Sequence, residues 1–165
     1  MRLEIKLANG NDFMELVRCS ASENLLEGAR NYVELHISHL KDFYESRNTC
    51  DPFKHVVAYA VNEVGIIVGF RYFYHKPGST LCHLFATFVD VDLRKNGIAS
   101  SLIKKSFELA VADGCTEFEV RLTEPSVEKD ALFYLYKEFA KSNSLKLKIY
   151  YWNRLVQFDY ETCNT

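Results

Sequence analysis

The sequence predicts an α/β protein of the α+β kind, with a mixed, mostly antiparallel sheet of about six to seven strands flanked by about four helices. Three observations lead to this class. Residues 56–61 and 65–75 are β-branched and aromatic runs joined by a short polar turn, as in a hairpin. Residues 81–91 form a third run, and apolar residues at helical spacing follow directly, up to residue 112. Residues 116–123 alternate again, so the helix before them predicts a strand parallel to the third run.

The N-terminal elements follow from spacing and from turn residues. Residues 2–7 alternate as a first strand, and the turn at 9–12 leads into a helix that we expect to begin near Phe13. Residues 20–30 are polar and fit a helix or a loop. A stripe of apolar residues predicts a second helix over 31–46.

The C-terminal elements are read in the same way. Gly114 is typical of a residue that ends a helix. A turn that includes Ser126 precedes a last helix, which we expect to extend to about Lys141. Residues 146–151 and 155–160 then pair as a closing hairpin.

Composition limits the class of protein. With 165 residues, of which 48% are hydrophobic, we expect one domain over residues 1–165. A formal net charge of −2 supplies no basic field, so a nucleic-acid partner is not expected. No apolar run reaches the length of a membrane span and the first residues do not form a signal peptide, so we expect a cytoplasmic protein without membrane contact. The five cysteines lack a C-x-x-C pair and are expected to be reduced thiols.

The turn between the run at 81–91 and its helix is the most informative stretch. Arg94, Lys95 and Asn96 lead there into Gly97. A helix that begins directly after a strand leaves its first amide N–H groups unpaired, with the positive end of the helix dipole behind them. The small residues of this turn let an anion approach the backbone closely. The turn lacks the glycine spacing of the nucleotide P-loop and of the dinucleotide fingerprint.

These residues, R-K-N-G-I-A from Arg94 to Ala99, resemble the acetyl-coenzyme A (acetyl-CoA) signature R/Q-x-x-G-x-G/A of the GCN5-related N-acetyltransferase (GNAT) superfamily. Upstream, Val91 replaces a proline that is usual in the family. The resemblance implies the GNAT acyl-CoA N-acyltransferase fold, in which two parallel strands separate and hold the pantetheine arm. It also implies direct transfer of an acetyl group from acetyl-CoA, as cosubstrate, to a primary amine of a small molecule or protein.

The resemblance further implies which residues bind the coenzyme. Backbone groups of Val89 and Val91 pair with the pantetheine amide, the amides of residues 95–100 hold the pyrophosphate, and Arg94 contacts a phosphate. The whole set is Val89, Asp90, Val91, Arg94, Lys95, Asn96, Gly97, Ile98, Ala99 and Ser100. The resemblance also implies that a backbone N–H near Phe88 and Val89 faces the thioester carbonyl.

Catalytic residues are carried over in the same way. Tyr136 resembles the general acid that protonates the coenzyme thiolate. The last helix lacks the asparagine and the Gly-Phe pair usual in the family, so Tyr134 stays as an alternative. His83 lies eleven residues before Arg94, where some members have a glutamate base, and an imidazole titrates near neutral pH. Glu124 and a chain of water molecules are the other candidates for the base.

The acceptor is less well defined. In the family the first two helices and the closing hairpin form the walls of the acceptor site. Acidic residues in the first helices here favour a cationic amine such as a polyamine, an aminoglycoside or a lysine side chain. A solvated helix face explains the same residues equally well. They are Glu15, Glu23, Glu27, Glu34, Asp42 and Glu45.

Three further expectations concern metals, partners and activity. His36 and His39 lie within one helical turn, but no recognisable third ligand accompanies them, so no metal site is predicted. Family members often form dimers through the closing strands, so a homodimer is one expectation. The alternative to an enzyme is a catalytically degenerate GNAT domain that binds acyl-CoA as a sensor or interaction module.

Overall fold

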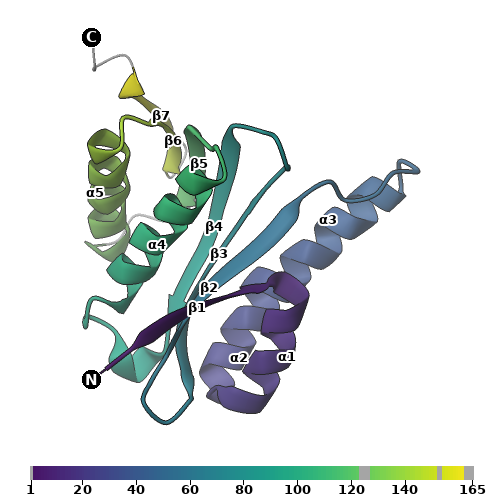
Figure 1. The fold of residues 1–165 in the computed structure, drawn as a ribbon, viewed down its shortest axis with the longest axis vertical. Helices are drawn as coiled ribbons and strands as arrows, with labels where there is room; N and C mark the ends of the chain where they lie inside the picture. Colours follow the sequence, from purple (N-terminus) through teal and green to yellow (C-terminus); the bar gives the residue numbers. More distant parts are fainter. Residues whose placement is uncertain (1, 123–126, 152–153, 162–165) are drawn as a thin grey trace.

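The computed structural model describes residues 2–122, 127–151 and 154–161, and it is built on one seven-stranded sheet (Figure 1). The strands lie side by side in chain order. They are β1 (Glu4–Asn9), β2 (Lys54–Val61), β3 (Ile67–His75), β4 (Leu81–Val89), β5 (Glu117–Leu122), β6 (Lys146–Tyr151) and β7 (Arg154–Asp159). Neighbours run antiparallel except for the parallel pairs β4–β5 and β5–β6, because a helix connects each of these. The predicted fold class is confirmed.

Helices cover both faces of the sheet (Figure 1). One layer consists of α1 (Gly10–Ser20), α2 (Glu23–Ala29) and α3 (Leu35–Glu45), with a π-helical turn, Arg30–Glu34, between the last two. The other layer consists of α4 (Ile98–Ala112) and α5 (Val127–Ser142). Apolar side chains fill the space between the sheet and each layer, with Phe13 and Phe70 under the first and Phe107 and Phe118 under the second.

Capping side chains explain where the first helices begin. The Asn9 side chain accepts a hydrogen bond of 2.9 Å from Asp12 N, so α1 begins at Gly10 and not near Phe13. Ser22 caps α2, and residues 20–30, which fitted a helix or a loop, are mostly helical. The helix predicted over 31–46 is therefore the second part of a longer helical segment.

Other boundaries also differ from the predicted ones. The first strand is Glu4–Asn9 instead of residues 2–7. Strand β4 ends at Val89, and Val91 begins a 3-10 turn, Val91–Leu93, instead of ending the strand. Gly114, with a φ of 93°, ends α4 as predicted. The predicted cap at Ser126 lies outside the described residues.

Two further properties concern the described part of the chain. Within it, none of the helices combines the length and apolar character that crossing a membrane requires. Four cysteines are free thiols, Cys19, Cys50, Cys82 and Cys115; Cys163 lies outside the described residues. A hydrogen bond to Cys115 and burial raise the pKa of Cys82, which keeps that thiol protonated and unreactive.

Candidate active site

The parallel strands β4 and β5 separate partway along β4. They pair only over Leu81–Leu84 and Glu117–Val120, although β4 continues to Val89. Over residues 85–89, no described strand pairs with the edge of β4 that faces β5. An open edge of this kind offers N–H and C=O groups to an extended ligand. We refer to the opening between residues 85–89 of β4 and β5 as the gap. The resemblance predicts that the pantetheine arm lies in this gap.

A β-bulge marks the start of the gap. Leu84 pairs with Phe73 of β3 and Ala86 pairs with Tyr72, so Phe85 has no residue opposite it. A bulge bends its strand and increases the local twist. This bend turns β4 away from β5 at the point where pairing stops.

The hydrogen-bond pattern of the antiparallel pair β3–β4 shows which residues of β4 direct their backbone groups into the gap. Asp90 N donates to Val68 O at 2.9 Å, so this residue faces β3. Alternate residues face opposite ways, and Thr87 and Val89 therefore direct their N–H and C=O groups into the gap.

The glycine turn lies at the open end of the gap. Gly97 has a φ of 77° and Lys95 a φ of 69°, both in the left-handed region, which a lysine adopts only with strain. A Cβ at Gly97 would meet nothing within 4 Å, so backbone conformation and not space favours glycine here. The first hydrogen bond of α4 runs from Ser101 N to Gly97 O. The amides of residues 98–100 precede it and have no acceptor within the helix, as an anion site requires.

The side chains of this loop are tied to their own backbone. Arg94 Nε donates to Val89 O at 3.1 Å, and its guanidinium carbon lies 5.2 Å from the centroid of the Phe88 ring. Asn96 Nδ2 donates to Leu93 O at 3.0 Å. The carbonyl of Val89, one of the groups facing the gap, is thus bound to Arg94.

The two candidate general acids differ in environment. Tyr136, on α5, is 1% exposed, whereas Tyr134 is 65% exposed. The Tyr136 ring lies 6.2 Å from that of Phe107 and 5.3 Å from the guanidinium carbon of Arg71. Arg71 in turn donates from Nη1 to Thr87 Oγ1 at 2.6 Å. Tyr136 is therefore linked through Arg71 to the gap.

His83 lies on the opposite face of the sheet, beneath the α1–α3 layer. Its ring stacks on Tyr74 at 4.8 Å, and its Nδ1 is 3.9 Å from Glu119 Oε2 on β5. Burial lowers the pKa of His83, and the Glu119 carboxylate opposes this shift. The neutral imidazole that a general base needs is favoured as a result.

His36 also faces this region, from α3. Its ring stacks on Phe85, the bulged residue, at 3.9 Å, and it lies 5.2 Å from the Tyr74 ring. Burial, together with the charge of nearby His55, lowers the pKa of His36 to about 4. His36 Nε2 is buried without a hydrogen-bond partner among the described residues.

A carboxylate, an imidazole and a phenol form a chain next to these histidines. His55 Nε2 is 2.7 Å from Asp51 Oδ2, and His55 Nδ1 is 2.7 Å from Tyr72 Oη. Tyr72 is fully buried, and burial raises its pKa. We refer to Asp51, His55 and Tyr72 as the polar chain.

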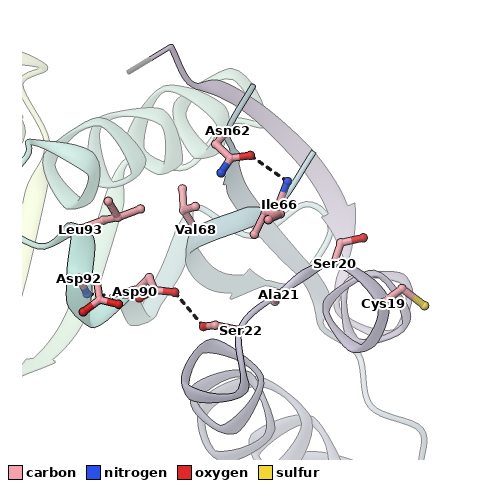
Figure 2. Close-up of a pocket in the computed structure, with 10 residues that line it drawn as sticks. All are labelled: Cys19, Ser20, Ala21, Ser22, Asn62, Ile66, Val68, Asp90, Asp92 and Leu93. Carbon is pink, nitrogen blue, oxygen red and sulfur yellow. Dashed lines mark hydrogen bonds between the residues drawn. The ribbon is translucent and has the colours of Figure 1, made fainter. Parts of the chain in front are cut away.

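A pocket of about 540 Å³ lies beside the turn that follows β4, and Figure 2 shows the residues that line it. It lies where the Ser20–Ser22 link, the β2–β3 turn and the 3-10 turn meet. Ser22 Oγ donates to Asp90 Oδ2 at 2.7 Å on its wall. Asp90 is the only predicted coenzyme residue that lines this pocket.

The structure brings some predicted residues together and separates others. Val89 adjoins the gap, and residues 94–100 form the loop and helix start at its open end. Tyr136 and His83 lie on opposite faces of the sheet. Glu124 lies outside the described residues. No group of three or more His, Cys, Asp or Glu side chains suited to a metal ion occurs in the described ranges.

Sequence reasoning missed Arg71 and the polar chain. The signal for Arg71 was present, because this residue interrupts an otherwise apolar and aromatic strand and a charge there must be buried. The signal for the polar chain was weak, because Asp51 and His55 precede or begin a strand, and Tyr72 joins them only through the β2–β3 pairing.

Comparisons with known proteins agree with this geometry. A structure of ribosomal-protein-alanine N-acetyltransferase from Brucella melitensis biovar Abortus 2308 matches with a TM-score of 0.53 and 22% identity, over 84% of this chain and 91% of that chain. An aminoglycoside acetyltransferase from an uncultured soil metagenomic sample matches with a TM-score of 0.50 and 20% identity, over 84% and 90%. AAC(6')-Iy in complex with the bisubstrate analogue CoA-S-monomethyl-acetylneamine matches with a TM-score of 0.50 and 19% identity, over 84% and 90%.

At these identities the structures show a shared fold. A comparison with curated protein sequences gave no significant match. The model of the acetyltransferase (GNAT) family, in contrast, matches residues 18–139. That match spans the separated strands, the glycine turn and most of the last helix, and the chain therefore belongs to the acetyltransferase (GNAT) family.

Proposed function

We propose that this protein transfers an acetyl group from acetyl-CoA directly to a primary amine while both are bound. The observation that carries the proposal is the continuity between the β4–β5 gap and the glycine turn. The gap offers an unpaired strand edge, and the turn offers free amides at the start of α4. A strand edge suits the amides of a pantetheine arm, and a helix N-terminus suits a pyrophosphate.

The proposed coenzyme site uses the loop in a specific way. Val89 N–H and C=O bind the pantetheine, and the amides of residues 95–100 bind the pyrophosphate. Asp90 and Val91 shape the turn between these two parts. When the pantetheine takes over the carbonyl of Val89, Arg94 is released from it and becomes free to contact a phosphate.

The chemical step needs a base on the side of the amine and an acid on the side of the thiolate. We assign the base to His83, whose neutral form burial favours, and the acid to Tyr136. The two lie on opposite faces of the sheet, and the gap connects those faces. The amine loses its proton to His83, its nitrogen bonds to the carbonyl carbon, the C–S bond breaks, and Tyr136 protonates the sulfur.

The proposed acceptor is a primary amine, and a cationic one fits the acidic first helices. The six acidic residues that favour a cationic amine in the sequence analysis are all exposed. Two are ion-paired, Glu34 with Arg18 and Glu45 with Lys41, which weakens the field available to a ligand. One of the similar structures is of an aminoglycoside acetyltransferase, and another holds a CoA-acetylneamine bisubstrate analogue, but the shared fold does not extend their substrates to this chain.

Calorimetric titration of acetyl-CoA into the wild-type protein and the Gly97→Glu variant tests the coenzyme site. The glutamate places a carboxylate against the pyrophosphate, so binding should be lost. Gly114→Glu is the matched control, because Gly114 also has a positive φ and open space around its Cβ position. Both variants thus carry the same charge and similar backbone strain, and only Gly97→Glu should lose binding. A wild-type protein that binds no acetyl-CoA would contradict the proposal.

A further inference from the structure

Arg71 is a buried cation without a counter-charge among the described residues. It is 1% exposed, and its neighbours on β3 are apolar and aromatic. Nη1 donates to Thr87 Oγ1, but Nε and Nη2 are buried and have no hydrogen-bond partner in the described part of the chain. No described carboxylate forms an ion pair with it. Burying an unpaired guanidinium costs free energy of folding. A functional role would explain why an arginine is present here.

The position of Arg71 indicates a role in the reaction. It pairs across the sheet with Thr87, which directs its backbone groups into the gap beside the bulge. The 2.6 Å bond to Thr87 Oγ1 holds the guanidinium there. On the other side, the guanidinium carbon is 5.3 Å from the ring of Tyr136. Arg71 thus lies between the inner part of the gap and the proposed acid.

The free donors suit a charge that develops during reaction. Acyl transfer from a thioester moves an electron pair onto the sulfur as the C–S bond breaks. Donors that are already oriented and shielded from water stabilise such a charge without reorganisation. An arginine is suited to this role because it stays protonated and cannot itself become the acid.

We propose that Arg71 is a catalytic residue that binds the CoA thiolate through Nε–H and Nη2–H. The proposal rests on the proposed acetyltransferase function. The amine nitrogen bonds to the carbonyl carbon, its proton passes to the base, and the C–S electron pair goes to the sulfur, where Arg71 holds it. Tyr136 then gives its phenolic proton to the sulfur and regains one from solvent, while Arg71 remains protonated throughout.

Titration of the thiol of bound CoA tests this directly. The absorbance of the thiolate is followed against pH in the CoA complex, and the complex with desulfo-CoA, which has no thiol, is subtracted. In the wild-type complex the thiol pKa should lie below that of free CoA by about 1 to 3. In Arg71→Met the pKa should return to or exceed the free value, and Arg71→Lys should fall between. Equal thiol pKa values in the wild type and Arg71→Met would overturn the proposal.

Kinetics and stability provide a second test with the same variants. Arg71→Met should lower kcat on the order of 100-fold with the KM for acetyl-CoA changed only a few-fold. Its melting temperature should equal or exceed that of the wild type, because an apolar side chain of similar size replaces an unpaired charge. Arg121→Met, on exposed β5 residue Arg121, is the control for the change in net charge.

The outcomes separate this inference from the proposed function. If Arg71→Met unfolds or melts well below the wild type, Arg71 is a structural residue and the inference is wrong. If it turns over at the wild-type rate, the inference is also wrong, while acetyl transfer stands. If the wild-type protein binds no acetyl-CoA, the proposed function itself fails.

Discussion

Ser22 Oγ donates a 2.7 Å hydrogen bond to Asp90 Oδ2 and so joins two parts of the chain that are 68 residues apart. Ser22 also caps α2, since its Oγ accepts from Leu25 N at 3.3 Å. The other oxygen of Asp90 accepts from Asp92 N at 3.2 Å. One bond therefore ties the α1–α3 layer to the turn that leads from β4 into the proposed coenzyme loop.

Removing this bond should affect both stability and coenzyme binding. Ser22→Ala should lower the free energy of unfolding by about 1 kcal/mol through the lost cap. It should also weaken acetyl-CoA binding several-fold, because the turn before the loop loses a restraint. Urea denaturation and calorimetry measure the two effects.

Asn9→Ala is the matched control, because Asn9 caps α1 in the same way and its side chain bonds no residue of this turn. It should show a similar loss of stability with unchanged affinity for acetyl-CoA. Equal affinities for Ser22→Ala and the wild type would show that the bond does not restrain the loop.

The Tyr136→Phe variant separates an enzyme from a binding module. Without the phenolic proton, kcat should fall on the order of 100-fold, while the affinity for acetyl-CoA stays near that of the wild type. Tyr134→Phe is the control and should leave both quantities unchanged, since Tyr134 is largely exposed. A wild-type protein that binds acetyl-CoA, but acetylates none of a broad panel of amines, would favour the sensor alternative.

Acid pH should reduce activity through His83. Burial lowers its pKa below the ordinary 6.5, so kcat/KM should fall as the pH drops through a value below 6.5 and the imidazole becomes protonated. Glu119 raises this pKa. In Glu119→Gln the acid limb of the profile should therefore move to lower pH, and in His83→Gln it should disappear. If the acid limb lies at the same pH in the wild type, Glu119→Gln and His83→Gln, it reports the titration of a group other than His83.

Acid pH should also destabilise the fold through His36. Its pKa is lowered from 6.5 to about 4 in the folded protein. Between these values the unfolded chain binds a proton that the folded one does not, so stability is full above pH 6.5 and is lost as the pH falls toward 4. Allowing for partial exposure of the ring, this loss is roughly 2 kcal/mol.

The variant His36→Phe keeps a ring that can stack on Phe85 but removes the titration. Its unfolding free energy should depend less on pH in this window, by that amount. His39→Phe, at an exposed position one turn away, should leave the pH dependence of the wild type intact. Denaturant unfolding at several pH values across the window measures both.

Much of the fold was predictable because it depends on local patterns. The β-branched and aromatic runs of β2 and β3 and the alternation in β5 are typical of strands, and the order of hairpins and helices restricts how they pair. Gly97 marked the loop proposed to bind the coenzyme, because a turn from strand to helix needs a left-handed residue there. Local cues did not decide between a helix and a loop for residues 20–30, where the structure has the Ser22 cap and α2.

What the sequence determined by itself is therefore the fold class, the loop at residues 94–100 and the family. The tertiary structure alone decided which polar groups meet. Arg71 touches Thr87 because of the β3–β4 register, and Tyr136 reaches it only after α5 folds over the sheet. Asp51, His55 and Tyr72 meet because β2 and β3 pair. Such contacts join residues that are distant in sequence. Burial and strand register decide whether a charge is paired or left without a partner, and both are properties of the packed sheet.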